Sequence, residues 1–233
     1  MCERLQISYN EVDLKNIKLK DAQLSLLQSQ INPHFLYNTL DTIYWMSEFN
    51  RTSDVSQMVS SLSRLFRLSL AGDENDMVPL TTEIEHVECY LYIQQVRHQD
   101  QLSYLLDTQV DASHYMVNKL ILQPLVENAI LHGIDVTGCG TVKIYIFQER
   151  DCLIYEVRNT GTAVDISAIQ EILKKPISAE SGIGIRNIND RIRLRHGNEY
   201  GISCSLEKDE TVFRVTIPVI QREVPAHDNT DDC

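Results

Sequence analysis

The order of predicted strands and helices after residue 100 constrains the fold more than any other feature of this sequence. Residues 102–110 alternate apolar and polar side chains as a strand does, and residues 121–134 have helical spacing. The segments that follow are a hairpin turning at Arg150–Asp151, short helices at 166–175 and 185–197, and a hairpin at 202–219. This mixture of hairpins and helices predicts an α+β sandwich rather than a doubly wound parallel sheet.

The part before residue 100 has helical patterns only. Residues 10–49 and 54–71 are predicted to form two helices, and Thr82 opens a third with the capping-box pattern Thr82-x-x-Glu85. The first two helices make a helical hairpin with a broad apolar stripe, and such a hairpin has too little core to bury the stripe alone. We therefore expect two chains to associate into a four-helix bundle.

A proline lies inside the first predicted helix. Pro33 has no N–H group and clashes with the carbonyl of Ser29, which costs about 3 kcal/mol or more in a helix interior. The break allows the helix to change phase and softens it beside His34. A simpler interpretation is that Asn32 caps a helix that restarts at Pro33, with His34 as an ordinary surface residue.

The change of phase turns His34 away from the apolar side chains that follow it. At about 100° per residue, His34 lies roughly opposite the new stripe and shares its face with Asn38 and Asp41. The stripe is made of Leu36, Leu40 and Ile43. An exposed imidazole is therefore predicted, with an amide one turn away and a carboxylate two turns away.

Charge and composition exclude several classes of partner. The net charge is −12 and the isoelectric point is near 5.0, which argues against a nucleic acid or an anionic membrane surface but not against a single bound nucleotide. The six cysteines are scattered without a Cys-x-x-Cys pair, so we expect reduced thiols and no zinc site. Neither a membrane-length apolar run nor a signal peptide is found, so the chain as written is expected to be soluble.

Polar residues recur at the ends of the predicted elements in the second half. Asn128 and His132 lie four residues apart on a predicted helix and share a face. Asn159 and Gly161 end a predicted strand, and Gly182-x-Gly184 directly precedes a helix. Closely spaced glycines let backbone N–H groups approach phosphates, and a helix N-terminus favours anions. Taken singly, each pattern also fits a polar edge or an ordinary turn.

The three motifs together resemble a known family. The stretches "LQSQINPHFLYNTL", "LQPLVENAILHGI" and "SGIGIRNINDRI" occur in this order, and over about residues 20–220 the chain resembles bacterial two-component sensor histidine kinases of the LytS/YesM type. The resemblance implies that the second half is an ATP-binding α/β sandwich of the kind shared with gyrase, Hsp90 and MutL. It also implies a homodimer through the helical hairpin.

The resemblance assigns roles to the residues that match its motifs. His34 would accept the γ-phosphoryl group of ATP, and Asn128 would be the Mg²⁺ ligand. His132 would lie near the phosphates, while Gly182 and Gly184 would end the loop that covers ATP. In gyrase-type relatives a glutamate that activates water precedes this asparagine by four residues, but Pro124 stands there, so hydrolysis to water should be feeble.

The adenine-binding motif departs from the family pattern. The usual Asp-x-Gly-x-Gly reads Asn159-Thr-Gly161-Thr-Ala163, and Thr211 matches a position that supports the adenine pocket. The Asn159 amide can accept a hydrogen bond from the adenine amino group, but without charge assistance. Nucleotide affinity is therefore in question.

Two positions beside the phosphate acceptor also matter. Phe35 replaces the acidic residue that many histidine kinases carry after the histidine, so the Ser29 carbonyl or Asp41 would have to orient the imidazole. Asn38 lies one helical turn from His34 and is a candidate for aligning the water that dephosphorylates a regulator. The alternative is that Asn38 holds the His34 ring or bonds the backbone.

These observations predict an ATP- and Mg²⁺-dependent protein-histidine kinase that autophosphorylates His34 and transfers the group to the receiver domain of a response regulator. The alternatives are a nucleotide-sensing pseudokinase scaffold and, less compatible with Pro124, a gyrase-like ATPase. We expect the chain to be the cytoplasmic part of a membrane-anchored sensor. Its predicted parts are a signalling helix (1–25), a dimerisation and phosphotransfer region (26–100), a catalytic domain (101–222) and a disordered tail (223–233).

Overall fold

The structure, a computed structural model, describes residues 33–49, 51–70, 77–161, 165–174 and 184–222. The chain divides into two compact units, Met1–Val59 and Ser60–Cys233. The predicted helix before Pro33 and the predicted tail lie outside the described residues. In the part of the chain that is described, no helix has the length and apolar character needed to cross a bilayer.

The first unit contains helix α2 (Pro33–Glu48) and the beginning of helix α3 (Thr52–Leu70). The side chains of α2 that are buried within one chain are Phe35, Thr39 and Met46. Thr39 tolerates burial because its hydroxyl donates to the carbonyl of Phe35 at 2.7 Å.

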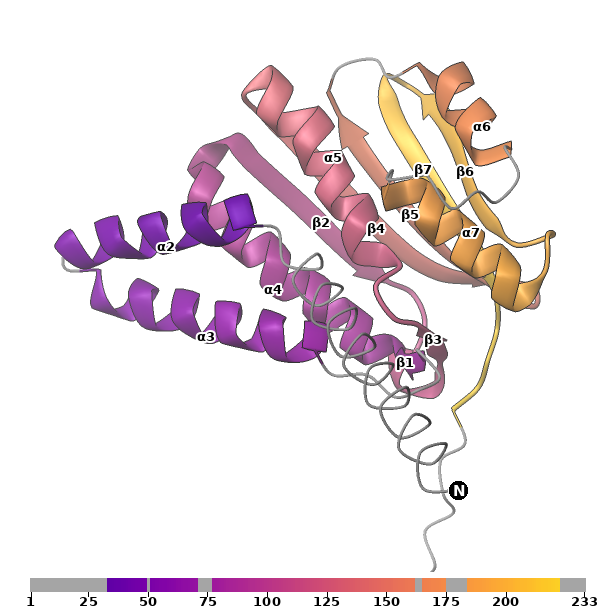
Figure 1. The fold of residues 1–233 in the computed structure, drawn as a ribbon, viewed down its shortest axis with the longest axis horizontal. Coiled ribbons are helices and arrows are strands. Elements are labelled where there is room, and N and C mark those ends of the chain that lie inside the picture. The colour runs from indigo at the N-terminus through magenta and orange to yellow at the C-terminus, as the bar shows by residue number, and fades with distance from the viewer. Residues whose placement is uncertain (1–32, 50, 71–76, 162–164, 175–183, 223–233) are drawn as a thin grey trace, which may run out of the picture. The chain divides into compact units, whose positions relative to one another are not determined.

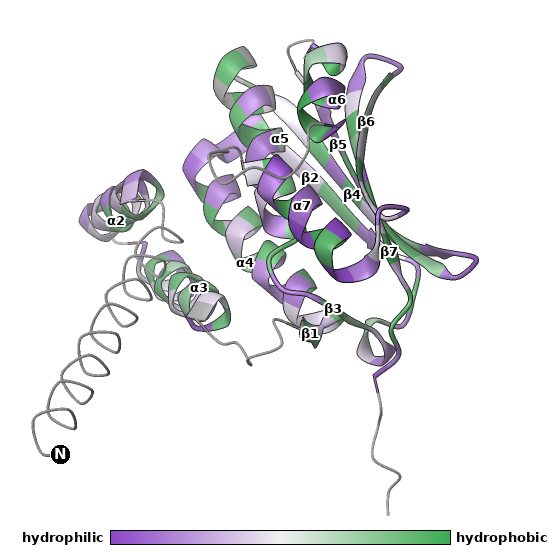
Figure 2. Cartoon of the chain, turned by 45° about the vertical axis from the view of Figure 1, so that its right-hand side comes forward, coloured by the Kyte–Doolittle hydropathy of each residue, from purple (hydrophilic) through white to green (hydrophobic). Residues whose placement is uncertain are grey.

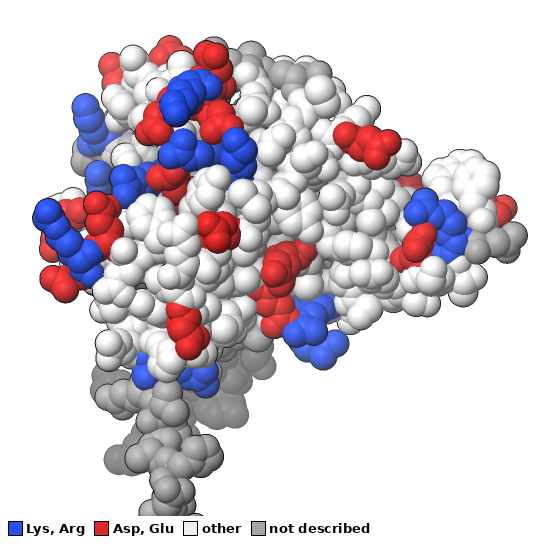
Figure 3. Space-filling model, turned by 180° about the vertical axis from the view of Figure 1, so that it is seen from behind, with Lys and Arg blue, Asp and Glu red and all other residues white. Residues whose placement is uncertain are grey.

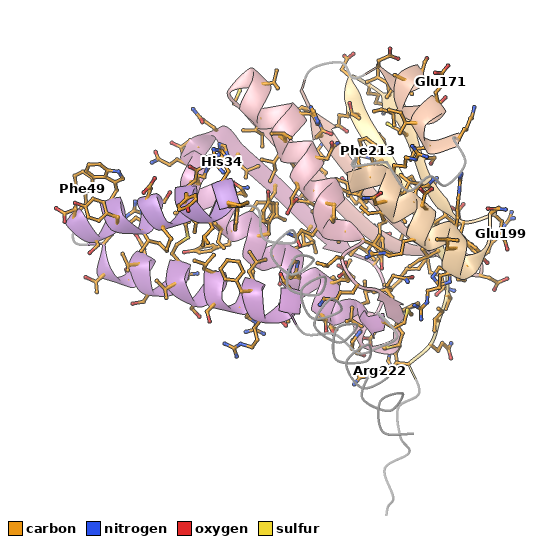
Figure 4. The ribbon with its side chains drawn as sticks, in the orientation of Figure 1. His34, Phe49, Glu171, Glu199, Phe213 and Arg222 are labelled. Carbon is orange, nitrogen blue, oxygen red and sulfur yellow. The ribbon has the colours of Figure 1, made fainter. Side chains whose placement is uncertain are left out.

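Within one chain the buried side of α2 differs from the predicted stripe. Leu40 is 48% exposed, and Leu36 and Ile43 are only half-buried. The side buried within the chain is centred about a quarter turn away, on Phe35 and Thr39, and burial of the predicted stripe would need a second chain. His34 is exposed, as predicted (Figure 4).

The second unit is built on a five-stranded sheet with the order β2-β4-β5-β7-β6. Its strands are β2 (Leu102–Thr108), β4 (Gly140–Glu149), β5 (Cys152–Thr160), β6 (Gly201–Glu207) and β7 (Glu210–Pro218). Strands β2 and β4 pair in parallel, and the other neighbours are antiparallel. Both predicted hairpins are confirmed, with Arg150 at a positive φ of 55° in the first turn.

Helices cover one face of this sheet (Figures 1 and 2). They are α4 (Leu80–His98), α5 (Leu122–Thr137), α6 (Ile166–Lys174) and α7 (Gly184–His196). The core lies between the two layers and contains fully buried side chains from both, including Leu125 and Ile130 of α5 and Phe213 of β7, which Figure 4 labels. The predicted α+β sandwich is therefore confirmed.

The other face of the sheet is charged. Lys143 Nζ lies 2.6 Å from Glu210, and Arg158 forms ion pairs with Glu156 and, at 3.2 Å, with Glu207. Seen from behind, acidic and basic side chains gather together in one part of the surface, and much of the rest carries neither charge (Figure 3). By alternation, Ile154 of β5 shares this face with Glu156 and Arg158, and both Ile154 and Glu156 are buried, so β5 is apolar on both faces near its start.

Two details differ from the predictions. Helix α4 begins at Leu80 after Pro79 without a side-chain cap, so the predicted capping box at Thr82 is wrong, and Glu85 instead forms an ion pair with Arg64. The structure also contains a short antiparallel pair, β1 (Met77–Pro79) with β3 (Met116–Asn118), that was not predicted. Strands of three residues are too short to produce a recognisable alternation.

Candidate functional site: the junction of α5, β5 and β7

Helix α5 and the end of strand β5 approach each other more closely than side chains would allow. A Cβ atom on Gly133 would lie 2.8 Å from the carbonyl oxygen of Thr160, and one on Gly161 would lie 2.6 Å from the Cα atom of Gly133. Both positions therefore require glycine, because such Cβ contacts are not tolerated. This contact brings the helix that carries Asn128 and His132 against the strand that carries Asn159.

Gly133 was missed by the sequence analysis. A glycine inside a helical pattern costs about 1 kcal/mol relative to alanine, and such a residue usually has a packing reason. That signal was present, but only the fold identifies Gly161 as the partner.

Asn159 and Thr211 are brought together by the register of the sheet. They are directly opposed on β5 and β7, and each is only 3% exposed. The Asn159 Nδ2 atom makes one long contact of 3.5 Å to the carbonyl of Thr160. No other hydrogen bond of the Asn159 side chain is found among the described residues, so this buried amide has capacity for a ligand. An adenine amino group is a ligand of that kind.

Asn128 and His132 lie on the same face of α5, one turn apart. The Asn128 side chain is half-buried and that of His132 is exposed, and the His132 carbonyl would lie 3.2 Å from a Cβ on Gly161. Asn128 is five residues from Gly133, which corresponds to about 7.5 Å of helix rise. A neutral amide oxygen is a ligand that can hold Mg²⁺ together with phosphate oxygens.

Glu127 precedes Asn128 and is held by its own helix. Gln123 Nε2 donates to its carboxylate at 2.5 Å, and burial raises the pKa of Glu127 although this bond opposes the shift. Pro124 lies in the first turn of α5, where a missing N–H costs little. The described residues contain no group of three or more His, Cys, Asp or Glu side chains that could hold a metal alone.

Gly184 begins helix α7, and no described atom lies within 4 Å of a Cβ built on it. Its predicted role at the phosphates stays a prediction. Gly182 lies outside the described residues.

Asn189 of α7 anchors the segment between Gly161 and Gly184, another feature that the sequence analysis missed. This residue is fully buried, donates to the carbonyl of Leu173 at 3.2 Å and accepts from the N–H of Ile202 at 2.8 Å. The end of α6 is thereby tied to both α7 and β6.

In the first unit, Asn38 contacts the imidazole of His34. Its Nδ2 atom lies 3.2 Å from His34 Nε2 and 3.4 Å from Nδ1, on the exposed surface of α2. The predicted partner Ser29 lies outside the described residues, and Asp41 is exposed. The amide contact is the geometry expected if Asn38 orients the ring.

Both parts of the chain match known protein families. Residues 22–102 match the family model of histidine kinases, and residues 118–221 match that of the histidine kinase-, DNA gyrase B- and HSP90-like ATPases. The catalytic domain of histidine kinase ThkA in a nucleotide-free form has a similar fold, with a TM-score of 0.50 and 18% identity over 61% of this chain and 95% of that one.

Full-length relatives are similar over nearly the whole chain. The sensor histidine kinase YesM of Bacillus subtilis is 34% identical, and BtsS of Escherichia coli is 33% identical, each over 94% of this chain. The sensor protein LytS of Bacillus cereus is 29% identical over 91%. The chain spans 37% of the length of each of these relatives. With both domains matched in order, the chain belongs to the sensor histidine kinases of the YesM, BtsS and LytS type and corresponds to their kinase region.

Proposed function

We propose that this chain is an active ATP-dependent histidine kinase that phosphorylates His34 and then passes the phosphoryl group to an aspartate of a response regulator. The observation that carries the proposal is the close packing of α5, the helix that carries Asn128, on the end of β5 through Gly133 and Gly161, beside the opposed pair Asn159 and Thr211. A neutral metal ligand and a buried adenine acceptor are thus held on rigid elements, which suits a reaction that depends on positioning.

Different residues bind the adenine and the phosphates of ATP in this proposal. Asn159, supported by Thr211, accepts from the adenine amino group, and His132 and the backbone at Gly182 and Gly184 hold the phosphates. Mg²⁺ bound at Asn128 supplies neutralisation of the phosphate charge.

His34 Nε2 then attacks the γ-phosphorus in line. A nitrogen–phosphorus bond forms, the bond from phosphorus to the β–γ bridging oxygen breaks, and ADP leaves with that electron pair. The imidazole gives its remaining proton to water. The attack requires the neutral imidazole, because the lone pair of Nε2 forms the new bond.

The active unit is a homodimer in this proposal. The supporting observation is an apolar surface on α2 that one chain leaves open, in which Tyr37 is 66%, Leu40 48% and Tyr44 58% exposed. A second copy would cover this surface in a helical bundle. The partners beyond the dimer are a receiver domain and a membrane-anchored sensory part outside this chain, in keeping with the fraction of the relatives that it spans.

The test is incubation of the full chain with γ-labelled ATP and Mg²⁺. We expect label that is lost in acid and kept in alkali, as for phosphohistidine, and no label on His34→Gln, which should still bind nucleotide. His114→Gln is the matched control, because His114 is also exposed and lies in the other unit. Label that persists on His34→Gln would exclude His34 as the acceptor.

A pseudokinase that senses nucleotide is the second candidate, and Asn159 in place of the usual aspartate is the observation that favours it. The same experiment separates the two functions. Binding of ATP without any label on wild-type protein would support the pseudokinase, whereas restoring the acid with Asn159→Asp should only tighten binding in an active kinase.

Asn38 has two candidate roles in this kinase. If it aligns water for dephosphorylation, Asn38→Ala should leave autophosphorylation largely unchanged and slow the loss of phosphate from the regulator. If it holds the His34 ring instead, autophosphorylation should change and dephosphorylation should not, and the 3.2 Å contact from its Nδ2 atom to Nε2 must open before that nitrogen can attack.

A further inference from the structure

Helix α5, which carries Asn128, does not cap its own N-terminus. Ile121 occupies the N-cap position, and no side-chain bond from it reaches the first turn. The first turn itself offers no serine, threonine or acidic side chain, because its sequence is Leu-Gln-Pro-Leu. The free N–H groups at this helix end are buried and need acceptors from elsewhere.

Glu83 of α4 supplies the acceptors. Its carboxylate accepts from the N–H groups of Leu120 at 2.5 Å, Ile121 at 3.1 Å and Leu122 at 3.2 Å. The Glu83 side chain is only 2% exposed, so it is committed to this contact. A carboxylate at a helix N-terminus also interacts favourably with the helix dipole.

Arg191 of α7 holds the same turn from the other side. Its Nη2 atom donates to the carbonyls of Lys119 at 2.5 Å and Leu120 at 2.9 Å. Leu120 has a φ of 56°, a left-handed conformation that is unfavourable for leucine and persists only where the surroundings enforce it. Here the carboxylate fixes its N–H and the guanidinium fixes its carbonyl.

The two groups also interact electrically. Burial raises the pKa of Glu83, while the three backbone N–H groups and the positive charge of Arg191 oppose that shift. These contacts are therefore what favours an ionised carboxylate in a site that water does not reach.

We propose that Glu83, with Arg191 opposite it, is a positioning residue that sets where α5 begins and so how Asn128 lies relative to Gly184. Asn128 is six residues along α5 from Leu122, and Arg191 is seven residues along α7 from Gly184, about two turns in each case. The turn at 119–121 thus joins the two helices on the phosphate side of the nucleotide. The strands with Asn159 and Thr211 are not part of this linkage.

The proposal rests on the proposed function of the site, and it makes a selective prediction. Displacing α5 along its axis should weaken the interaction with metal-bound phosphates more than the interaction with adenine. The quantity to measure is the dissociation constant for ATP with excess chelator divided by the dissociation constant for ATP with Mg²⁺. Both are measured in the full chain, at a temperature well below its unfolding transition. A smaller ratio means that Mg²⁺ strengthens ATP binding less.

Glu83→Gln keeps the size of the side chain but removes the charge and turns a donor toward the backbone N–H groups. We expect its ratio to fall about tenfold, since loss of a charged hydrogen-bond acceptor is typically worth at least this much. Glu83→Asp, which keeps the charge, should recover part of the ratio. The matched control is Glu85→Gln on the same helix, which loses an ion pair with Arg64 and should keep the wild-type ratio.

A purely structural role for Glu83 would lower the unfolding temperature and leave the ratio unchanged, and that result would overturn the proposal. Should Glu83→Gln not fold, Arg191→Lys tests the same turn from α7 and must reduce the ratio likewise, or the proposal is wrong. The proposed kinase activity fails separately, because its measure is label on His34 of the wild-type protein and not the ratio.

Discussion

Acid should destabilise the second unit through one buried histidine. His86 of α4 is 2% exposed, and its Nε2 atom lies 2.7 Å from Ser69 Oγ at the end of α3. Ser69 Oγ also donates to the carbonyl of Leu65 at 2.8 Å, so the Nε2–H group of His86 is the donor between them. The Nδ1 atom is then an acceptor, buried without a hydrogen-bond partner among the described residues.

Protonation of this ring is unfavourable in the folded state. Burial lowers the pKa of His86 from 6.5 to about 4, with a smaller contribution from the charge of Lys119. Lys119 Nζ is fixed close by, since it donates to the Ser69 carbonyl at 2.6 Å. An imidazolium would place a second positive charge beside this ammonium group and would need an acceptor for the Nδ1 proton.

The sign and size of the effect follow from proton linkage. The folded pKa is depressed, so the neutral ring contributes its full stability above the unfolded value of 6.5, and the contribution is lost as the pH falls toward 4. At pH 5 the unfolded state is largely protonated and the folded state is not, which costs about 2 kcal/mol of the free energy of unfolding. Below pH 4 the loss approaches about 3 kcal/mol.

The assay is urea denaturation followed by far-UV circular dichroism at pH 7.5 and pH 5. The only tryptophan, Trp45, lies in the first unit, so its fluorescence would report on the wrong part of the chain. Many carboxylates also titrate in this range, and the useful quantity is therefore the difference between wild type and His86→Gln. The variant cannot titrate and should lose about 2 kcal/mol less on acidification.

The control is His114→Gln, which removes an exposed histidine that lies 3.2 Å from Asp111, so a change common to both variants would come from the loss of any histidine and not from the burial of His86. If His86→Gln loses as much stability as wild type between pH 7.5 and pH 5, the buried neutral histidine is not the cause and the reasoning is refuted.

Three further predictions concern the site and the assembly. Asn128→Ala and Asn128→Asp should weaken Mg²⁺-dependent ATP binding, measured by calorimetry, at least about tenfold, and normal Mg²⁺-dependent turnover in both would exclude Asn128 as the metal ligand. Gly133→Ala should lower the free energy of unfolding, measured by urea denaturation, by about 1–3 kcal/mol, because its Cβ would overlap the Thr160 carbonyl, and an unchanged value would exclude this close approach. Light scattering should report about twice the chain mass of 26.7 kDa, and a strict monomer at high concentration would contradict the dimer.

The elements of the fold were largely predictable because their signals are local. Alternation in residues 102–110 and in both hairpins is a property of each strand alone, and the helical spacing of 121–134 needs no partner to be recognised. Predictions failed where a partner decides the outcome. The buried side of α2 depends on what packs against it, and Thr82 was not needed as a cap because the helix begins two residues earlier.

Part of the candidate site could also be predicted from local motifs, and part could not. The sequence alone was sufficient to identify the family, because its motifs can be read in order along the chain. The same motifs name His34, Asn128, Asn159 and Thr211 as candidates, and their roles stay predictions. The sequence did not predict that β2 pairs in parallel with β4 or that Asn159 lies directly opposite Thr211. The neighbours of a strand depend on how the whole sheet and its helices pack.

Contacts distant in sequence were decided only by the tertiary structure. Glu83 meets its N–H partners 37 to 39 residues away, and in the sequence it resembles any acidic residue on a solvated helix. Gly133 meets Gly161 only because α5 lies across the end of β5. Local patterns determine which helix or strand forms. Burial and close approach depend on elements that folding brings together from distant parts of the chain. Burial of this kind is what lowers the pKa of His86, and the packing of α5 fixes where Asn128 lies.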